Sequence, residues 1–321
     1  MNDRVRIDID GDGVADVCLV RGDKMNALDA ARFAALAAAI DRLKTEPGLR
    51  AVVLHGEGKA FCAGLDMGRF AAMGAGGGPP GQRLLARTHG PSNSSQYVAL
   101  GWRELPVPVV AAVHGVAFGG GLQLALGADI RLVTPQTRMS VMEIKWGLVP
   151  DMAGLVLMRG LLRDDVAREL GYTGRIVHGD EAVQVGLATR ACADPLAEAR
   201  VLAQTMAQRS PGAVRAAKRL FNQAHHMLDN GAAQLLQAES DEQAALIRHP
   251  PCCALRNSPL GTARRRSWAG PISWRRCTPT WNGARRDSRG RGRSCPPGDV
   301  GGRAAGLMFV HPLQPPRKTP E

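Results

Sequence analysis

The amino-acid sequence predicts an α/β protein in which strands and helices alternate. Two short hydrophobic runs, LRAVVLH at residues 49–55 and VVAAV at residues 109–113, predict interior strands. A helical pattern over residues 29–44 precedes the first run. Strand, helix and strand in this order are typical of a right-handed crossover, the building block of an α/β domain. With 45% apolar residues in a chain of 321, a substantial core can form.

The first residues predict a β-hairpin. Residues 5–9 and 14–20 carry the apolar residues of two strands, and an Asp-Gly turn lies between them. The aspartates around this turn imitate the first ligands of a calcium loop. Such a loop needs a bidentate acid at its twelfth position, and Leu19 stands there. The sequence therefore favours a turn over a calcium site.

Three helices have recognisable starts. Asp29 is a favourable N-cap residue for a helix that runs through Lys44 and ends at Pro47-Gly48. Asp194-Pro195 and Ser210-Pro211 predict the starts of two later helices, because proline is favoured in the first turn. These helices would cover the strands of the sheet.

Two glycine-rich junctions are candidates for a binding site. Gly119, Gly120 and Gly121 follow the strand at residues 109–113 and open a helix, where backbone N–H groups lack intrahelical partners. This arrangement suits an anion or a developing oxyanion, although a tight turn between strand and helix is an alternative interpretation. A second glycine turn precedes residues 59–66, KAFCAGLD. The amides of both junctions could converge on one oxygen atom.

Five motifs together resemble the crotonase, or enoyl-CoA hydratase/isomerase, family over roughly residues 1–248. They are MNAL (25–28), AVVLHGEGKAFCAGLD (51–66), PVVAAVHGVAFGGGLQLALGADIRL (108–132), MEIKWGLVPD (142–151) and ELGYTGRIVHGDEAVQVGLA (169–188). The resemblance implies a spiral of ββα units with a helical C-terminal oligomerisation region. It also implies an acyl-CoA substrate and a homotrimer or homohexamer.

The resemblance assigns roles to backbone groups at both junctions. It implies that the N–H groups of Leu65 and Gly120 hold the thioester carbonyl of the substrate. Each such donor contributes about 3 to 4 kcal/mol of transition-state stabilisation in enzymes where it has been removed. The positions implied for substrate and CoA binding are Lys24, Ala27, Ala63, Leu65, Asp66, Gly119 and Gly120.

The acidic residues decide which reaction the site would catalyse. Hydratases of this family use two glutamates, but the first position is Gln123, which cannot act as a base; the second is present as Glu143. Asp151 stands where dienoyl-CoA isomerases carry an aspartate. Two carboxylates of opposite protonation state suit proton transfer at the two ends of a diene, Glu143 beside the thioester and Asp151 at the far end. Asp151 could instead cap a helix beginning at Met152.

Three functions follow as hypotheses. The first is double-bond isomerisation by Glu143 and Asp151, and the second is hydration of a 2-enoyl-CoA by Glu143 with help from Gln123. The third is RNA binding by an arginine-rich tail that also carries Trp268, Trp274 and Trp281. We expect no metal or redox cofactor, since coenzyme A would arrive as part of the substrate.

Three further residues invite functional interpretations. Cys62 is more typical of a small buried apolar residue than of a nucleophile. His114 is predicted to be structural, packed under the glycine turn. Lys218 could reach a CoA phosphate, but a solvated helix lysine is the favoured interpretation.

The chain divides into three predicted regions. Residues 1–195 form the α/β core, and residues 196–248 form the helical region. Residues 249–321 hold fourteen basic and three acidic residues, so most of the net charge of +12 lies there. This proline- and arginine-rich tail is predicted to be disordered or the product of a frameshift. Within the core, residues 71–96 predict a mobile surface segment over the acyl-chain pocket.

No secretory signal and no apolar run of membrane-spanning length is visible in the sequence. We therefore expect a soluble cytoplasmic protein.

Overall fold

The computed structural model describes residues 4–66, 68 and 84–227, and seven positions between 233 and 244. All of them lie in one compact unit, residues 1–264. Residues 71–83 of the expected mobile segment, most of residues 228–248 and the whole tail lie outside the described residues. The boundaries of the three predicted regions therefore stay predictions. The expectation of a mobile surface segment is wrong at residues 92–96, because Ser92, Asn93 and Gln96 are buried and a helix begins at Ser94.

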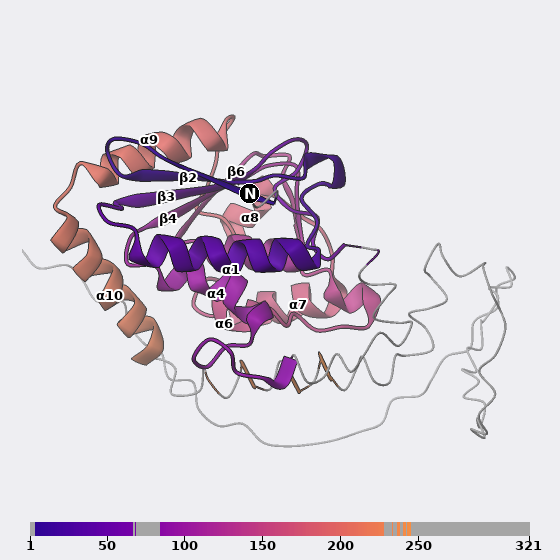
Figure 1. Ribbon diagram of the computed structural model, residues 1–321. Helices are drawn as coiled ribbons and strands as arrows, with labels where there is room; N and C mark the ends of the chain where they lie inside the picture. Colours follow the sequence, from indigo (N-terminus) through magenta and orange to yellow (C-terminus); the bar gives the residue numbers. More distant parts are fainter. Residues whose placement is uncertain are drawn as a thin grey trace, which may run out of the picture. The chain divides into compact units, whose positions relative to one another are not determined.

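A six-stranded sheet forms the centre of the fold, in the order β1-β2-β3-β4-β6-β9 (Figure 1). Its strands are β1 (Val5–Ile9), β2 (Val14–Leu19), β3 (Ala51–Gly56), β4 (Val109–Val113), β6 (Ile130–Val133) and β9 (Arg190–Ala191). The β1–β2 hairpin is antiparallel and all other pairs are parallel. This confirms the predicted hairpin and the α/β class.

Helices cover both faces of this sheet, as Figure 1 shows. They are α9 (Pro195–Ala207) on one face, and α1 (Ala30–Thr45) and α4 (Ser94–Glu104) on the other. Every residue of β3 and β4 is buried, because the strands are packed on two sides. Ala199, Ala203 and Ala207 of α9 pack against Val53 and Val110.

The predicted helix starts are confirmed by their caps. The Asp29 side chain accepts a hydrogen bond of 2.7 Å from the N–H of Arg32 at the start of α1. Asp194 accepts bonds from the N–H groups of Leu196 and Ala197 at the start of α9. These bonds satisfy donors that a helix leaves unpaired in its first turn.

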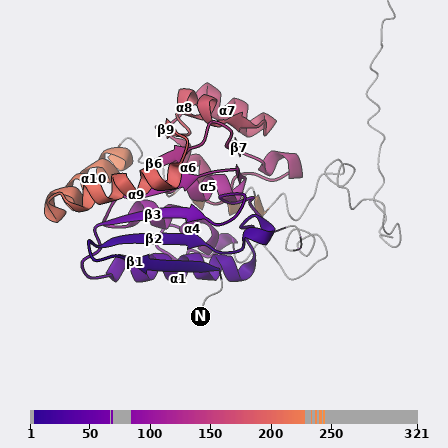
Figure 2. The ribbon, with the colours of Figure 1, turned by 90° about the horizontal axis from the view of Figure 1, so that it is seen from above.

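A second, smaller sheet was not expected from the sequence. It consists of β5 (Val116–Phe118), β7 (Arg138–Ser140) and β8 (Val177–His178), in the order β5-β7-β8. The shorter helices are α5 (Gly120–Leu126), α6 (Gly154–Met158), α7 (Asp164–Thr173) and α8 (Gly179–Val185), with the 3-10 helices η1 (Gly22–Lys24) and η2 (Glu143–Trp146). Figure 2 shows α7 and α8 at the β9 end of the large sheet, away from β1.

The last described helix, α10 (Pro211–Met227), corrects the expectation for Lys218. Only 7% of this lysine is exposed. Its Nζ donates to the backbone oxygen of Val107 at 2.7 Å and lies 2.8 Å from Asp129 Oδ2. Burial lowers the pKa of Lys218, and the charge of Asp129 opposes that shift. Lys218 is therefore a structural cation and not a solvated helix lysine.

Among the described residues, no helix is both long and apolar enough to cross a membrane.

Replacing Lys218 with alanine should lower the free energy of unfolding by about 3 kcal/mol, because Asp129 would keep its charge without this partner. Urea denaturation followed by circular dichroism measures the change. Arg219 is exposed on the same helix, so Arg219→Ala is the control and should change stability by less than about 0.5 kcal/mol. Equal losses in the two variants would contradict a buried ion pair.

Candidate active site

The loop at residues 60–66 is held between two neighbouring segments by main-chain hydrogen bonds. On one side, the N–H of Cys62 donates to Val116 at 3.1 Å and the N–H of Phe118 donates to Cys62 at 3.2 Å. On the other side, Leu28 pairs with Leu65 in a parallel bridge. The N–H of Leu28 donates to Gly64, and the N–H of Asp66 donates to Leu28. The N–H of Leu65, which lies between these two bonds, therefore points away from Leu28.

The same loop lies directly against the start of α5. Gly64 has φ +89°, and a Cβ atom placed on it would lie 2.5 Å from the backbone oxygen of Phe118 and 3.7 Å from the nitrogen of Gly120. A Cβ on Gly121 would lie 2.2 Å from the backbone oxygen of Cys62. Only glycine fits at these two positions. The two predicted glycine-rich junctions are therefore in contact with each other.

Two backbone N–H groups at this contact have no acceptor in the part of the chain that the structure describes. They belong to Leu65 and to Gly120, the first residue of α5. The neighbouring Gly119 differs, because its N–H donates to Ser140 at 3.0 Å. The N–H groups of Leu65 and Gly120 are therefore unpaired within the described residues; their contact with a thioester oxygen stays a prediction.

A buried carboxyl group lies beside these glycines. Glu143 begins η2 and is 8% exposed, and a Cβ on Gly119 would lie 3.2 Å from its Oε1. Burial raises the pKa of Glu143 to about 7, against the hydrogen bonds from its own N–H and from Gln123. The negative charge of Asp151 adds to the rise. A carboxylic acid with this pKa can exchange protons near neutral pH.

Gln123 determines which oxygen of Glu143 can carry the proton. Its Oε1 accepts the N–H groups of Met152 at 2.8 Å and Gly154 at 2.9 Å, which fixes the orientation of the amide. Its Nε2 then donates to Glu143 Oε1 at 2.6 Å. Within the described structure, Glu143 Oε2 is buried without a hydrogen-bond partner. A proton on Glu143 therefore belongs on Oε2.

Asp151 lies in a turn ahead of α6. The helix begins at Gly154 with Ala153 at its N-cap position, so the expected start at Met152 is wrong. Asp151 therefore does not occupy the N-cap position. Its effect on the pKa of Glu143 places the two carboxyl groups within electrostatic reach of each other.

The remaining predicted binding residues lie around η1. Lys24 is exposed at the end of this short helix, while Ala27 is buried. The N–H of Ala63 donates to Met25 at 2.9 Å, and the carboxylate of Asp66 pairs with Arg21 at 2.8 Å. The structure thus brings these positions together next to Leu65; their contact with CoA stays a prediction.

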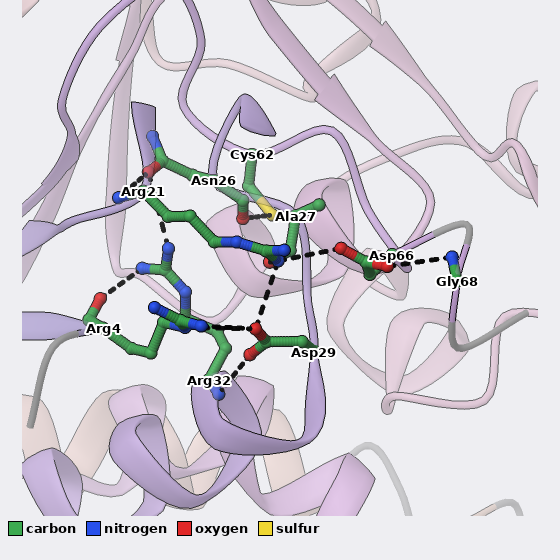
Figure 3. A network of polar contacts seen from close by, with 9 residues as sticks. All are labelled: Arg4, Arg21, Asn26, Ala27, Asp29, Arg32, Cys62, Asp66 and Gly68. Carbon is green, nitrogen blue, oxygen red and sulfur yellow. Dashed lines mark hydrogen bonds and ion pairs between the residues drawn. The ribbon is translucent and has the colours of Figure 1, made fainter. Parts of the chain in front are cut away.

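Sequence reasoning missed Arg21 and Asn26, which organise this region (Figure 3). Asn26 is fully buried with φ +55°. Its Nδ2 donates to Glu57 at 2.9 Å and Ala60 at 2.8 Å, and its Oδ1 accepts the N–H of Arg21 at 3.0 Å. The available signal was asparagine itself, which adopts the left-handed conformation more readily than most residues.

The interpretations of Cys62 and His114 are confirmed. The Cys62 thiol is fully buried and donates to the backbone oxygen of Asn26 at 3.2 Å. Burial raises its pKa to about 11, which leaves almost no thiolate at neutral pH. The Nε2 atom of His114 hydrogen-bonds the backbone oxygen of Gly58 at 2.9 Å, a structural contact.

Comparisons with known proteins agree on one family. A sequence model for the family described as enoyl-CoA hydratase/isomerase matches residues 10–250. A Bacillus subtilis (strain 168) protein named as a probable enoyl-CoA hydratase is 30% identical over 198 residues, covering 61% of this chain and 73% of that protein.

Solved structures give the same result. An enoyl-CoA hydratase/isomerase from Mycobacterium paratuberculosis matches with a TM-score of 0.66 at 26% identity, covering 77% of this chain and 98% of its own. An enoyl-CoA hydratase from Mycobacterium smegmatis matches with a TM-score of 0.59 at 30% identity, covering 77% and 91%.

The close approach at Gly64 predicts a large effect of one methyl group. Gly64→Ala should lower the free energy of unfolding by about 3 kcal/mol, because it combines an unfavourable positive φ with overlap against Phe118. Gly48→Ala is the matched control, with φ +77° and nothing within 4 Å of the added atom. It should cost about 1 kcal/mol. Equal losses in urea denaturation would contradict the contact between the segments.

The raised pKa of Glu143 predicts a pH-dependent loss of stability. The folded protein keeps this proton up to about pH 7, whereas an ordinary glutamate releases it near 4.5. Stability should therefore fall by about 3 kcal/mol, relative to Glu143→Gln, as the pH rises between these values. Urea denaturation of both proteins across this range measures the difference. A difference that stays constant with pH would contradict the buried site.

Proposed function

The chain belongs to the enoyl-CoA hydratase/isomerase family, and from this premise we propose that it moves double bonds along the acyl chain of an acyl-CoA thioester. The observation that carries the proposal is a single buried carboxyl, Glu143, next to the two unpaired N–H groups. Glutamine stands where a second glutamate would serve hydration, and Asp151 supplies the other carboxylate.

The N–H groups of Leu65 and Gly120 would hold the thioester oxygen. Removing a proton from the carbon next to a thioester moves negative charge onto that oxygen. Both donors come from rigid main chain, so they need little reorganisation as the charge develops. The expected contribution is about 3 kcal/mol for each donor.

Glu143 and Asp151 would share one exchangeable proton. With the proton on Glu143 Oε2, Glu143 can protonate the carbon next to the thioester of a 2,4-dienoyl-CoA while Asp151 removes a proton from the far end of the diene, which gives the 3,5-dienoyl-CoA. With the proton on Asp151, the opposite reaction runs: Glu143 removes a proton from the carbon next to the thioester of a 3,5-dienoyl-CoA, and Asp151 donates its proton to the far end of the diene. The raised pKa of Glu143 favours the first arrangement at rest. Each turnover leaves the pair with one proton, so no other reactant is needed.

Hydration of a 2-enoyl-CoA is the second candidate, since the Bacillus subtilis relative is named as a hydratase. Glu143 would then both activate the water and protonate the carbon. Gln123 cannot act as a base, and its Oε1 is occupied by two backbone N–H groups. Its remaining contribution would be to orient Glu143 and the water.

The proposal needs no metal or redox cofactor, because proton transfer alone moves the double bond and CoA belongs to the substrate. Assembly into a homotrimer or homohexamer and a cytoplasmic location stay proposals drawn from the family resemblance.

Isomerisation of a 3,5-dienoyl-CoA should fall by about 100-fold or more in both Glu143→Gln and Asp151→Asn, because each removes one proton-transfer group. The absorbance of the conjugated thioester measures the rate. Asp164→Asn is the control, because Asp164 makes an exposed ion pair on α7 and should not affect the rate.

A 2-enoyl-CoA separates the two candidates. The second proposal would replace the lead if two results are found together. The unmodified protein would not isomerise the diene, and its hydration of the 2-enoyl-CoA would survive Asp151→Asn but be lost in Glu143→Gln.

A further inference from the structure

Arg21 lies between two carboxylates, as Figure 3 shows. Its Nη1 is 2.8 Å from Asp66 Oδ2 and 3.2 Å from Asp29 Oδ2, and it also donates to the backbone oxygen of Ala27 at 3.4 Å. The three charged side chains are 17% to 21% exposed. Arg21 Nη1 therefore connects Asp29, Asp66 and the backbone of Ala27.

The carboxylates of Asp29 and Asp66 lie at one end of the Leu28–Leu65 bridge, and this bridge orients the peptide N–H of Leu65. Asp29 follows Leu28 and Asp66 follows Leu65. The N–H of Leu28 donates to Gly64 at 2.8 Å, and the N–H of Asp66 donates to Leu28 at 3.1 Å. Because the bridge is parallel, both aspartates emerge at the same end of it. Two negative charges held this close repel each other unless a cation lies between them.

We propose that Arg21 is a positioning residue for the Leu65 N–H, acting by cancelling the repulsion between Asp29 and Asp66. With Arg21 in place, the Leu28–Leu65 bridge stays closed and the Leu65 N–H keeps its direction towards the Gly120 junction. The inference rests on the proposed role of that N–H in holding the thioester oxygen. A small displacement of such a donor costs rate because its stabilisation depends on close geometry.

The surrounding contacts show what holds each carboxylate besides Arg21. Asp29 is also held by Arg4 at 3.0 Å and by the N–H of Arg32, so it stays in place without Arg21. Asp66 also accepts the N–H of Gly68 at 2.9 Å, a local bond within its own loop. Loss of Arg21 would therefore leave the charge of Asp29 in place and uncancelled opposite Asp66, the residue next to Leu65.

The backbone of Arg21 is fixed independently of its side chain. Its N–H donates to Asn26 Oδ1 at 3.0 Å, and its backbone oxygen accepts the N–H groups of Lys24 and Asn26. A substitution at this position therefore removes the charge without releasing the turn.

The test compares kcat and KM for the acyl-CoA substrate in Arg21→Gln, Asp29→Asn and the double variant. Arg21→Gln should lower kcat about 10- to 100-fold with KM changed less than about threefold, since the donor acts mainly on the developing charge. Asparagine caps helices as well as aspartate, so Asp29→Asn should keep kcat within about threefold. The double variant should recover to within about fivefold of the unmodified protein, because only one negative charge remains.

Two controls make the result specific. Arg6→Gln breaks an exposed pair with Asp8 and should leave kcat and KM unchanged. The infrared band of a thioester carbonyl labelled with carbon-13, in a bound 2-enoyl-CoA, should move back towards its free position in Arg21→Gln and not in Arg6→Gln. The double variant should restore the bound position.

The outcomes separate this inference from the proposed function. A working enzyme whose kcat and carbonyl band are unchanged in Arg21→Gln would overturn the role of Arg21 alone. A double variant as slow as Arg21→Gln would overturn the repulsion mechanism. Absence of any acyl-CoA turnover by the unmodified protein would overturn the proposed function and, with it, this inference.

Discussion

The arrangement of the candidate site depends on one contact, in which two backbone segments approach too closely for side chains to fit between them. Gly64 and Gly121 meet the main chain of Phe118 and Cys62, so the Leu65 loop and the first turn of α5 lie edge to edge. The large sheet delivers both segments to one place. β3 and β4 are adjacent parallel strands, and the chain leaves both at their carboxyl ends. Two amides far apart in the sequence thereby face one site.

The replacement of a second glutamate by glutamine controls the electrostatics of that site. A carboxylate at position 123 would place an oxygen against Glu143 Oε1, and the two groups would have to share a proton. Gln123 instead accepts two backbone N–H groups and donates to Glu143. Among the described residues, Glu143 is thus the one buried acidic side chain at the glycine junction, so the proposed isomerisation takes its second carboxyl group from elsewhere. In the proposed isomerisation, Asp151 in the turn before α6 would be that second carboxyl group.

The large sheet, the helix caps and the glycine junctions could be predicted from the sequence, because their signals are local. The signals are continuous hydrophobic runs for the strands, Asp29 and Asp194 for the caps, and a glycine triplet for the junction with α5. The small sheet was missed because strands of two or three residues carry no periodicity. Lys218 was misassigned because its partner Asp129 is distant in sequence. The contacts of Arg21 could not be found for a similar reason, since Asp29 and Asp66 come together only when Leu28 and Leu65 are already paired.

The network around η1 explains how the site can be formed before substrate arrives. Met25 and Asn26 both have positive φ, which costs about 1 kcal/mol or more for each residue. The buried side chain of Asn26 offsets this strain through its bonds to Glu57, Ala60 and the Arg21 backbone. The turn is therefore held in one conformation by the folded protein itself. Arg21 projects from this fixed turn, so the proposed positioning of the Leu65 N–H would need no contribution from substrate binding.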